Sequence, residues 1–207
     1  MRSRFTAFAA VLLIVAVGGV AAACGTGSDH SAMGHDDAGT THDGMSHNSE
    51  QMGTGREADV MFTQEMIPHH EQAVEMADLA LDPVREASPA VQALAKRIKA
   101  AQSAEIVDMK AWLREWDATA TSEHMEHMGE NGMGMMSTAQ MTALSEATGA
   151  AFDRLWLEGM IEHHEGALMM ASHIAERGED PRVQQLSQAI DSSQTAEITE
   201  MKQLLDQ

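Results

Sequence analysis

From residue 57 to the end of the chain, apolar residues recur at helical spacing. They step by three, four or seven positions over about 57–80, 89–116 and 151–177, and again from 181 nearly to the end. Such steps place apolar side chains on one face of a helix. Strands are not expected, because β-branched residues are sparse and do not alternate with polar ones. The pattern therefore predicts an all-α fold with four main helices.

Turn and capping residues mark the ends of these helices. Ser, Asp and Pro favour the first positions of a helix, and Gly favours its end. Pro68 lies inside the first helix and removes one backbone hydrogen bond, so we expect a kink just before His69. The end signals are Asp82 and Pro83 after the first helix, Ser88 and Pro89 before the second, Ser137 and Gln140 before a short helix ending near residue 147, Gly178 after the next long helix, and Asp180 and Pro181 before the last.

The first and third main helices carry the same motif. Residues 66–76 (MIPHHEQAVEM) return as residues 160–170 (MIEHHEGALMM), with two Met residues, a His pair and a small residue at matching offsets. The match extends in both directions, which indicates a duplicated helical hairpin. Packed together, two such hairpins make a four-helix bundle. Further matched pairs are Asp59 and Asp153, Phe62 and Trp156, Gln102 and Gln194, Glu105 and Glu197, Ile106 and Ile198, and Met109 and Met201.

The second helix has one acidic residue on its apolar face, Glu105, and Glu197 repeats this exception in the last helix. A buried carboxylate must be paired or must bind a ligand. The stripe that we expect to face inward consists of Val91, Leu94, Ile98, Ala101, Glu105, Met109 and Trp112.

The two His pairs and their acidic and Met neighbours form a candidate metal site. Adjacent residues point about 100° apart on a helix. We therefore expect one His of each pair to face the interior near Glu105 and Glu197, and the other to face a neighbouring helix or solvent. The alternative is that His–Glu hydrogen bonds hold the hairpins in register without metal. The candidate ligands are His69, His70, Met76, Glu105, His163, His164, Met170 and Glu197.

The N-terminus has the pattern of an export signal over residues 1–23. Arg2 and Arg4 precede an apolar run over 5–20, and three Ala residues follow just before Cys24. These residues resemble a bacterial lipobox, although Ala21 stands where Leu is usual. We expect Cys24 to be lipidated and to anchor the protein to the outer face of the membrane. The alternative is an ordinary cleaved signal beside a chance Cys.

Two segments are rich in Gly, polar residues, His and Met, and cannot form a core. Residues 24–56 are expected to be a disordered tether, and residues 117–137 a loose linker between halves at about 57–116 and 138–207. Imidazole and thioether groups on a flexible chain can wrap a copper ion. The alternative is a polar linker with accidental His. The residues expected to assist metal capture are His30, Met33, His35, His42, Met45, His47, His124 and His127.

Charge and cysteine content narrow the class of function. The formal net charge of -19 argues against nucleic acid as a partner and against a basic grip on anionic lipid. The chain has a single Cys, which excludes an internal disulfide and thiolate sites such as zinc ribbons or iron–sulfur clusters.

The double Met-Ile-x-His-His motif, the Gly-Met-Met-Ser sequence at 134–137 and the Phe-Asp pair at 152–153 resemble the bacterial domain-of-unknown-function family 305 (DUF305) over about 57–205. The resemblance implies a ferritin-like four-helix fold. Some members are associated with copper binding and copper tolerance outside the cytoplasm, so it also implies such a role here. Glu162 replaces Pro68 in the second copy, and Gly166 stands where a small residue would serve. The residues that match the family signature are His69, His70, Met76, His163, His164 and Met170.

Three functions remain open from the sequence. The leading one is a membrane-anchored, extracytoplasmic protein that binds copper for buffering or tolerance, with other transition metals and a homodimer left open. The second is a ferritin-like di-metal oxidase, which would need Glu-x-x-His motifs on facing helices, and none occurs in the chain. The third is a metal-free interaction lipoprotein whose acidic surface makes the contact.

Overall fold

The computed structural model describes residues 54–119 and 132–207, and all regular structure within these ranges is helical. Every helix there falls short of the length and hydrophobicity that crossing a bilayer requires. Residues 1–53 and 120–131, and with them the expected signal, Cys24 and tether, lie outside the described residues. The elements in chain order are α1 (Arg56–Leu81), η1 (Pro83–Arg85), α2 (Pro89–Glu115), η3 (Gly132–Gly134), α3 (Thr138–Glu146), α4 (Gly149–Arg177) and α5 (Pro181–Leu205).

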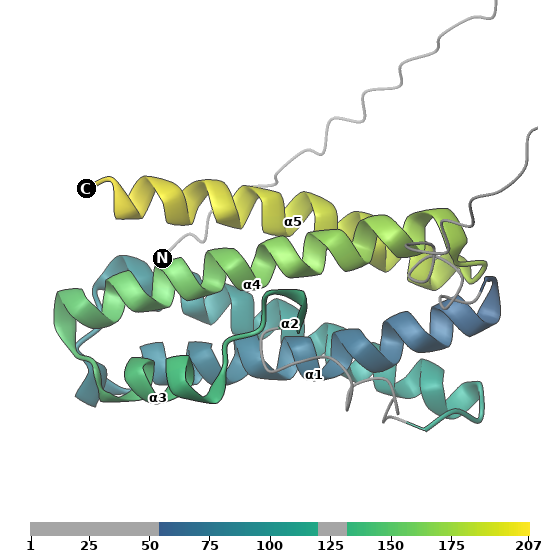
Figure 1. Cartoon of the computed structure of the whole chain (residues 1–207), viewed down its shortest axis with the longest axis horizontal. Coiled ribbons are helices and arrows are strands. Elements are labelled where there is room, and N and C mark those ends of the chain that lie inside the picture. The colour runs from purple at the N-terminus through teal and green to yellow at the C-terminus, as the bar shows by residue number, and fades with distance from the viewer. Residues whose placement is uncertain (1–53, 120–131) are drawn as a thin grey trace, which may run out of the picture. The chain divides into compact units, whose positions relative to one another are not determined.

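The helices form two antiparallel hairpins, α1 with α2 and α4 with α5, that pack mainly through α1 and α4 (Figure 1). In contrast, α2 and α5 barely touch each other. The predicted four-helix bundle of duplicated hairpins is therefore confirmed, with the short α3 as an addition to the second half. Pro68 lies inside α1, and the helix continues through it.

Each hairpin is fastened to the other by an aspartate. Asp59 of α1 accepts hydrogen bonds from the backbone N–H groups of Glu179 and Asp180, just before α5, at 3.2 and 2.8 Å. Asp153, its match on α4, accepts from the backbone N–H of Ser88, just before α2, at 3.1 Å. Both carboxylates satisfy N–H groups that a helix start leaves unpaired. The duplication thus places one fastening at each end of the α1–α4 contact.

The helix ends follow the predicted capping residues. Ser88 caps α2, Ser137 forms the capping box with Gln140, and Asp180 caps α5. Gly178 follows α4 as expected, but its φ of -73° is not left-handed. Glycine is needed there for another reason: a Cβ would lie 2.4 Å from Oδ1 of Asp59. The close approach of the aspartate fastening explains this glycine.

Two apolar clusters fill the bundle and lie on either side of the His pairs. Met66 and Met170 belong to one cluster, and Met76 and Met160 belong to the other. Along α1 and along α4, the His pair lies between these methionines. Trp156 Nε1 donates to the backbone oxygen of Met76 at 2.9 Å, which ties α4 to α1 inside the second cluster.

The expected inward stripe of α2 is wrong at one position. Ala101 is exposed, and the next residue, Gln102, is buried instead. The buried face of α2 runs through Ile98, Gln102 and Met109, which are four and seven residues apart, so at this turn it lies one residue beyond the expected position.

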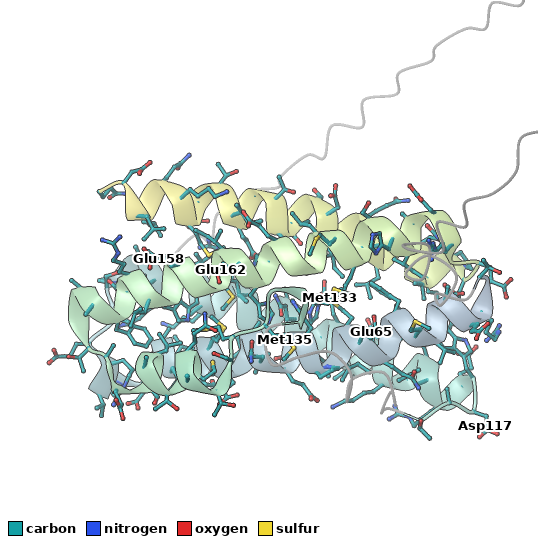
Figure 2. The ribbon with its side chains drawn as sticks, viewed as in Figure 1. Glu65, Asp117, Met133, Met135, Glu158 and Glu162 are labelled. Atoms are coloured by element: carbon teal, nitrogen blue, oxygen red, sulfur yellow. The ribbon has the colours of Figure 1, made fainter. Side chains whose placement is uncertain are left out.

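The end of the segment expected to be a loose linker is packed against α1 and α4. We call residues 132–137 the strap; Figure 2 shows two of its residues, Met133 and Met135, beside the middle of the bundle. Gln72 of α1 holds the strap by both backbone groups of Met136, donating to its oxygen at 2.9 Å and accepting from its N–H at 2.7 Å. Gly166 of α4 lies so close that a Cβ would be 1.7 Å from the backbone oxygen of Met133.

Replacing Gly166 with Ala should displace the strap and lower the free energy of unfolding by roughly 1–3 kcal/mol, despite the higher helix propensity of Ala. The clash is with backbone, which cannot rotate away. Urea denaturation of the purified chain measures the change.

Gly159→Ala is the matched control for this prediction. A Cβ at Gly159 would meet the side chain of Met136 at 2.8 Å, and a flexible thioether can move. Equal destabilisation by the two substitutions would contradict the tight backbone contact at Gly166.

Candidate metal centre

His69 of α1 and His163 of α4 face each other where the two helices cross. Their ring centroids are 3.7 Å apart with the planes tilted by 38°, and each residue is 1% exposed. Two imidazoles at this distance share one small space closed to solvent. The sequence left open whether the second His of each pair would face a neighbouring helix or solvent. The structure places it against a neighbouring helix, where it faces its copy across the interface between the hairpins.

The other His of each pair contacts a glutamate on the second helix of the same hairpin. Nε2 of His70 lies 2.8 Å from Oε2 of Glu105, and Nε2 of His164 lies 2.8 Å from Oε2 of Glu197. Both imidazoles are fully buried, whereas the two glutamate side chains are 22% and 18% exposed. The structure thus places Glu105 and Glu197 beside the His pairs, as the sequence predicted. We call His69, His70, His163 and His164 the histidine layer.

These hydrogen bonds fix where the ring protons lie. The backbone oxygen of Met133 can only accept, so the His69 Nε2 atom, 2.9 Å away, must carry the proton and donate it. A carboxylate likewise accepts from Nε2 of His70 and of His164. In a neutral ring the opposite nitrogen then carries a lone pair. The Nδ1 atoms of His69, His70 and His164 are buried without a hydrogen-bond partner, and so are both ring nitrogens of His163.

Burial keeps the two facing imidazoles uncharged. It lowers the pKa of His69 from 6.5 to about 3, helped by the proximity of His70, although the hydrogen bond to Met133 opposes the shift. Burial also lowers the pKa of His163 well below its ordinary value, helped by the neighbouring His69. Desolvation disfavours the charged ring in both cases. A neutral imidazole is the form that binds a metal ion.

Buried methionines lie on both sides of the histidine layer. Met66 and Met76 of α1 are inaccessible to solvent, as is Met160 of α4, and Met170 is 4% exposed. The sequence prediction had included Met76 and Met170 among the ligands. The structure assigns both to the apolar clusters next to the layer, where a thioether serves as packing and also as a soft donor.

Sequence reasoning missed two buried amides. Gln102 and Gln194 are each 3% exposed, and both amide atoms of Gln102 and Oε1 of Gln194 have no hydrogen-bond partner. Each lies one helical turn before the glutamate that contacts the histidine layer. The signal was present, because the two amides match in the repeat, but it was not connected with the site. The backbone oxygen of Met133 could not have been found from sequence, since its position depends on the strap.

The donor set limits which metals fit. In residues 54–119 and 132–207, no three His, Cys, Asp or Glu side chains come together in a way that could hold one ion. A site of four nitrogen and oxygen ligands, as zinc or a ferritin-type iron pair would need, is therefore not formed by these side chains. A site that combines imidazole with thioether remains, and that combination suits Cu(I).

The remaining candidate ligands lie outside the described residues. This applies to the two His-x-x-Met-x-His copies, to the His residues of the linker and to the lipidation site. They are His30, Met33, His35, His42, Met45, His47, His124, His127 and Cys24.

The metal-free protein should lose stability as the pH falls through 6.5. The unfolded chain takes up a proton on His69 below its ordinary pKa of 6.5, but the folded chain does so only near 3. Stability is therefore highest above 6.5 and declines as the pH falls toward 3. Between pH 7 and pH 5, His69 alone should account for about 2 kcal/mol. Urea denaturation at a series of pH values measures the slope.

His69→Gln should flatten this slope, because Gln can still donate to Met133 but does not titrate. His173→Gln is the control, since His173 lies on α4 and is exposed to solvent in the folded chain. A slope that is unchanged in His69→Gln would rule out the buried neutral ring.

The solved structures that this chain resembles have the same helical fold. A DUF305 protein of Streptomyces coelicolor, described as secreted, is 33% identical with a TM-score of 0.66, over 73% of this chain and 93% of that one. CopM in its Cu(I)-bound form is 34% identical with a TM-score of 0.58, over 72% and 95%. Structures of CopM with Cu(II) and with Ag are similarly related.

Two sequence comparisons complete the picture. The uncharacterized protein L153 of Acanthamoeba polyphaga mimivirus is 46% identical over 55 residues, which span only 36% of its length and 27% of this chain. The family model of the domain of unknown function DUF305 matches residues 59–205, which include both hairpins and the whole histidine layer. The chain belongs to the DUF305 family.

Proposed function

We propose that the protein binds copper outside the cytoplasm and holds Cu(I) at the histidine layer. One observation carries the proposal: neutral, buried imidazoles converge from both hairpins with ring nitrogens that have no partner. A buried polar atom without a hydrogen bond costs about 1–3 kcal/mol, so several in one layer need an explanation. A bound metal ion would satisfy these lone pairs. The CopM structures, named for Cu(I), Cu(II) and Ag, support copper as the metal.

The side chains at the histidine layer include suitable ligands for Cu(I) and acidic residues that would orient those ligands. His69 and His163 would be the central ligands, because each ring is buried, stays neutral and has a nitrogen without a hydrogen-bond partner. The neighbouring methionines supply thioether groups, which prefer Cu(I) over harder ions. Glu105 and Glu197 would orient His70 and His164 and raise their basicity, as carboxylates do behind metal-binding His residues. A copper ion bound by both central ligands would link the two hairpins.

The rest of the chain suits a role in buffering or tolerance. The export signal and Cys24 would hold the protein at the outer face of the membrane, and the His/Met segments around 30–47 and 124–127 would capture the ion. A formal net charge of -19 attracts cations to the surface. The competing hypotheses are a di-metal oxidase and a metal-free interaction protein. The first would need the Glu-x-x-His motifs that the sequence lacks, and the second would leave the ring nitrogens without a partner.

The double variant His69→Gln/His163→Gln should lose tight Cu(I) binding at the bundle. We would compare it with the wild-type sequence in a soluble form of residues 25–207, by competition with a chromophoric Cu(I) chelator. Removal of both facing imidazoles should weaken the site by roughly a hundredfold or more, because the variant loses the two central nitrogen donors. Affinity that survives unchanged would transfer copper binding to the tether and leave the bundle as a scaffold.

Glu105→Gln and Glu197→Gln should weaken Cu(I) binding by about 10–100-fold without changing the stoichiometry. The glutamates orient and polarise the His rings and do not need to touch the ion. Glu165→Gln is the matched control, since Glu165 is an exposed acid on α4 that pairs with Lys202. If all three substitutions have the same small effect, general charge and not orientation of the rings determines affinity.

A further inference from the structure

The duplication gives the α1–α4 interface two equivalent ends, and residues 54–119 and 132–207 fill only one of them. At the filled end, Met136 of the strap lies against Gly159, where its sulfur would be 2.8 Å from a Cβ. Leu144 of α3 packs in the same apolar cluster. At the other end, Glu65 occupies the position that matches Gly159.

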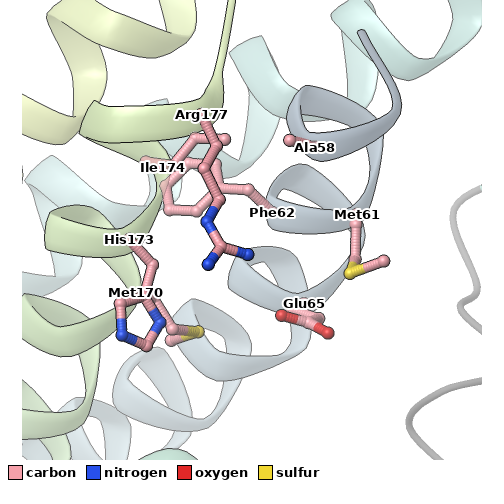
Figure 3. A pocket seen from close by; sticks show the side chains of 8 residues that line it. All are labelled: Ala58, Met61, Phe62, Glu65, Met170, His173, Ile174 and Arg177. Carbon is pink, nitrogen blue, oxygen red and sulfur yellow. The ribbon is translucent and has the colours of Figure 1, made fainter. Parts of the chain in front are cut away.

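The unfilled end is an open pocket of about 330 Å³, counting the space at its mouth. The described residues that line it belong to α1 and α4, and Figure 3 shows Met61 and Glu65 on one wall and Met170 and His173 on the other. Ala58, Phe62, Ile174 and Arg177 complete the lining.

The lining contains soft donors that helix packing does not require. At the filled end, the positions that match Met61 and His173 hold Leu155 and Leu79, so apolar residues suffice for packing there. Met61 is half-buried and His173 is exposed. Within the described residues, His173 forms no hydrogen bond or ion pair. Two thioethers and one free imidazole on facing walls are a donor set for a soft cation.

We propose that this pocket is a second, solvent-open site for a soft monovalent cation, Cu(I) or Ag(I), with Met61, Met170 and His173 as its ligands. This assignment rests on the proposed copper function. The spacing suits shared binding, because Met170 and His173 are three residues apart on α4 and so lie on one face. Glu65 and Arg177 bring opposite charges to the pocket, so its local charge does not repel a monovalent ion.

Met170 connects this pocket with the buried layer. It lines the pocket and also belongs to the apolar cluster that contains Met66, beside the histidine layer. An ion taken up from solvent at Met61 and His173 would thus meet a thioether that lies on the way to the buried imidazoles. The pocket is the place where the bundle acquires copper, and the histidine layer is where it is kept.

Titration of the metal-free soluble chain, residues 25–207, with Ag(I) tests the site. Ag(I) is a redox-inert probe for Cu(I), and ¹³C-methyl labelling of Met reports each thioether separately. We expect the methyl signals of Met61 and Met170 to shift. The double variant Met61→Leu/His173→Gln should lose the Met170 shift and weaken this site by roughly tenfold or more, because it removes two of three donors.

Two further variants separate this inference from the function on which it rests. Met169→Leu, which changes an exposed Met of α4 outside the pocket, should leave the shifts unchanged. His69→Gln/His163→Gln should abolish binding at the buried layer and keep the pocket shifts. If Ag(I) shifts the methyl signals of Met66, Met76 and Met160, which lie beside the histidine layer, but not that of Met61, the pocket assignment is wrong and the buried site stands. If Ag(I) shifts neither set, both proposals fail.

Discussion

The contact between His69 and His163 is the constraint on which the rest of the bundle depends. Their rings are 3.7 Å apart at the α1–α4 interface, which is the main contact between the two hairpins. Two desolvated imidazoles are packed there with ring nitrogens that accept no hydrogen bond, and this lowers the stability of the metal-free fold. The apolar clusters on both sides and the aspartate fastenings at the two ends must offset that cost. The interface is therefore stabilised at its periphery, whereas the His ring nitrogens at its centre lack hydrogen-bond partners and are available to a ligand.

Much of this arrangement could be predicted from the sequence, because the duplication repeats each sequence pattern. The matched His pairs and acids predicted the bundle and the proximity of one His of each pair to Glu105 and Glu197. They did not predict that His70 and His164 would be the ones that make these contacts. Capping residues such as Ser88 and Ser137 defined the helix ends, since capping is a local interaction.

What the sequence did not predict depends on distant backbone. The strap looked like a loose linker because its Gly and Met residues carry no periodic pattern, yet it supplies the carbonyl that fixes the ring proton of His69. Helical spacing also did not choose between Ala101 and Gln102, because both lie three or four residues after Ile98, and only the structure shows that Gln102 is the buried one. Nor could spacing alone show that His69 and His163 would meet, since that requires the crossing point of α1 and α4.

The strap has an evolutionary consequence. The Gln72 side chain forms hydrogen bonds with the backbone of the strap, whereas Gly166 lets the strap approach because it has no side chain. These two positions are equivalent in the repeat. A symmetric ancestor made of two identical hairpins would carry the same residue at both positions and could not hold a strap in this way. The two halves of the present chain are therefore not interchangeable. The position in α1 holds the strap by hydrogen bonds, and the equivalent position in α4 leaves the space that the strap occupies.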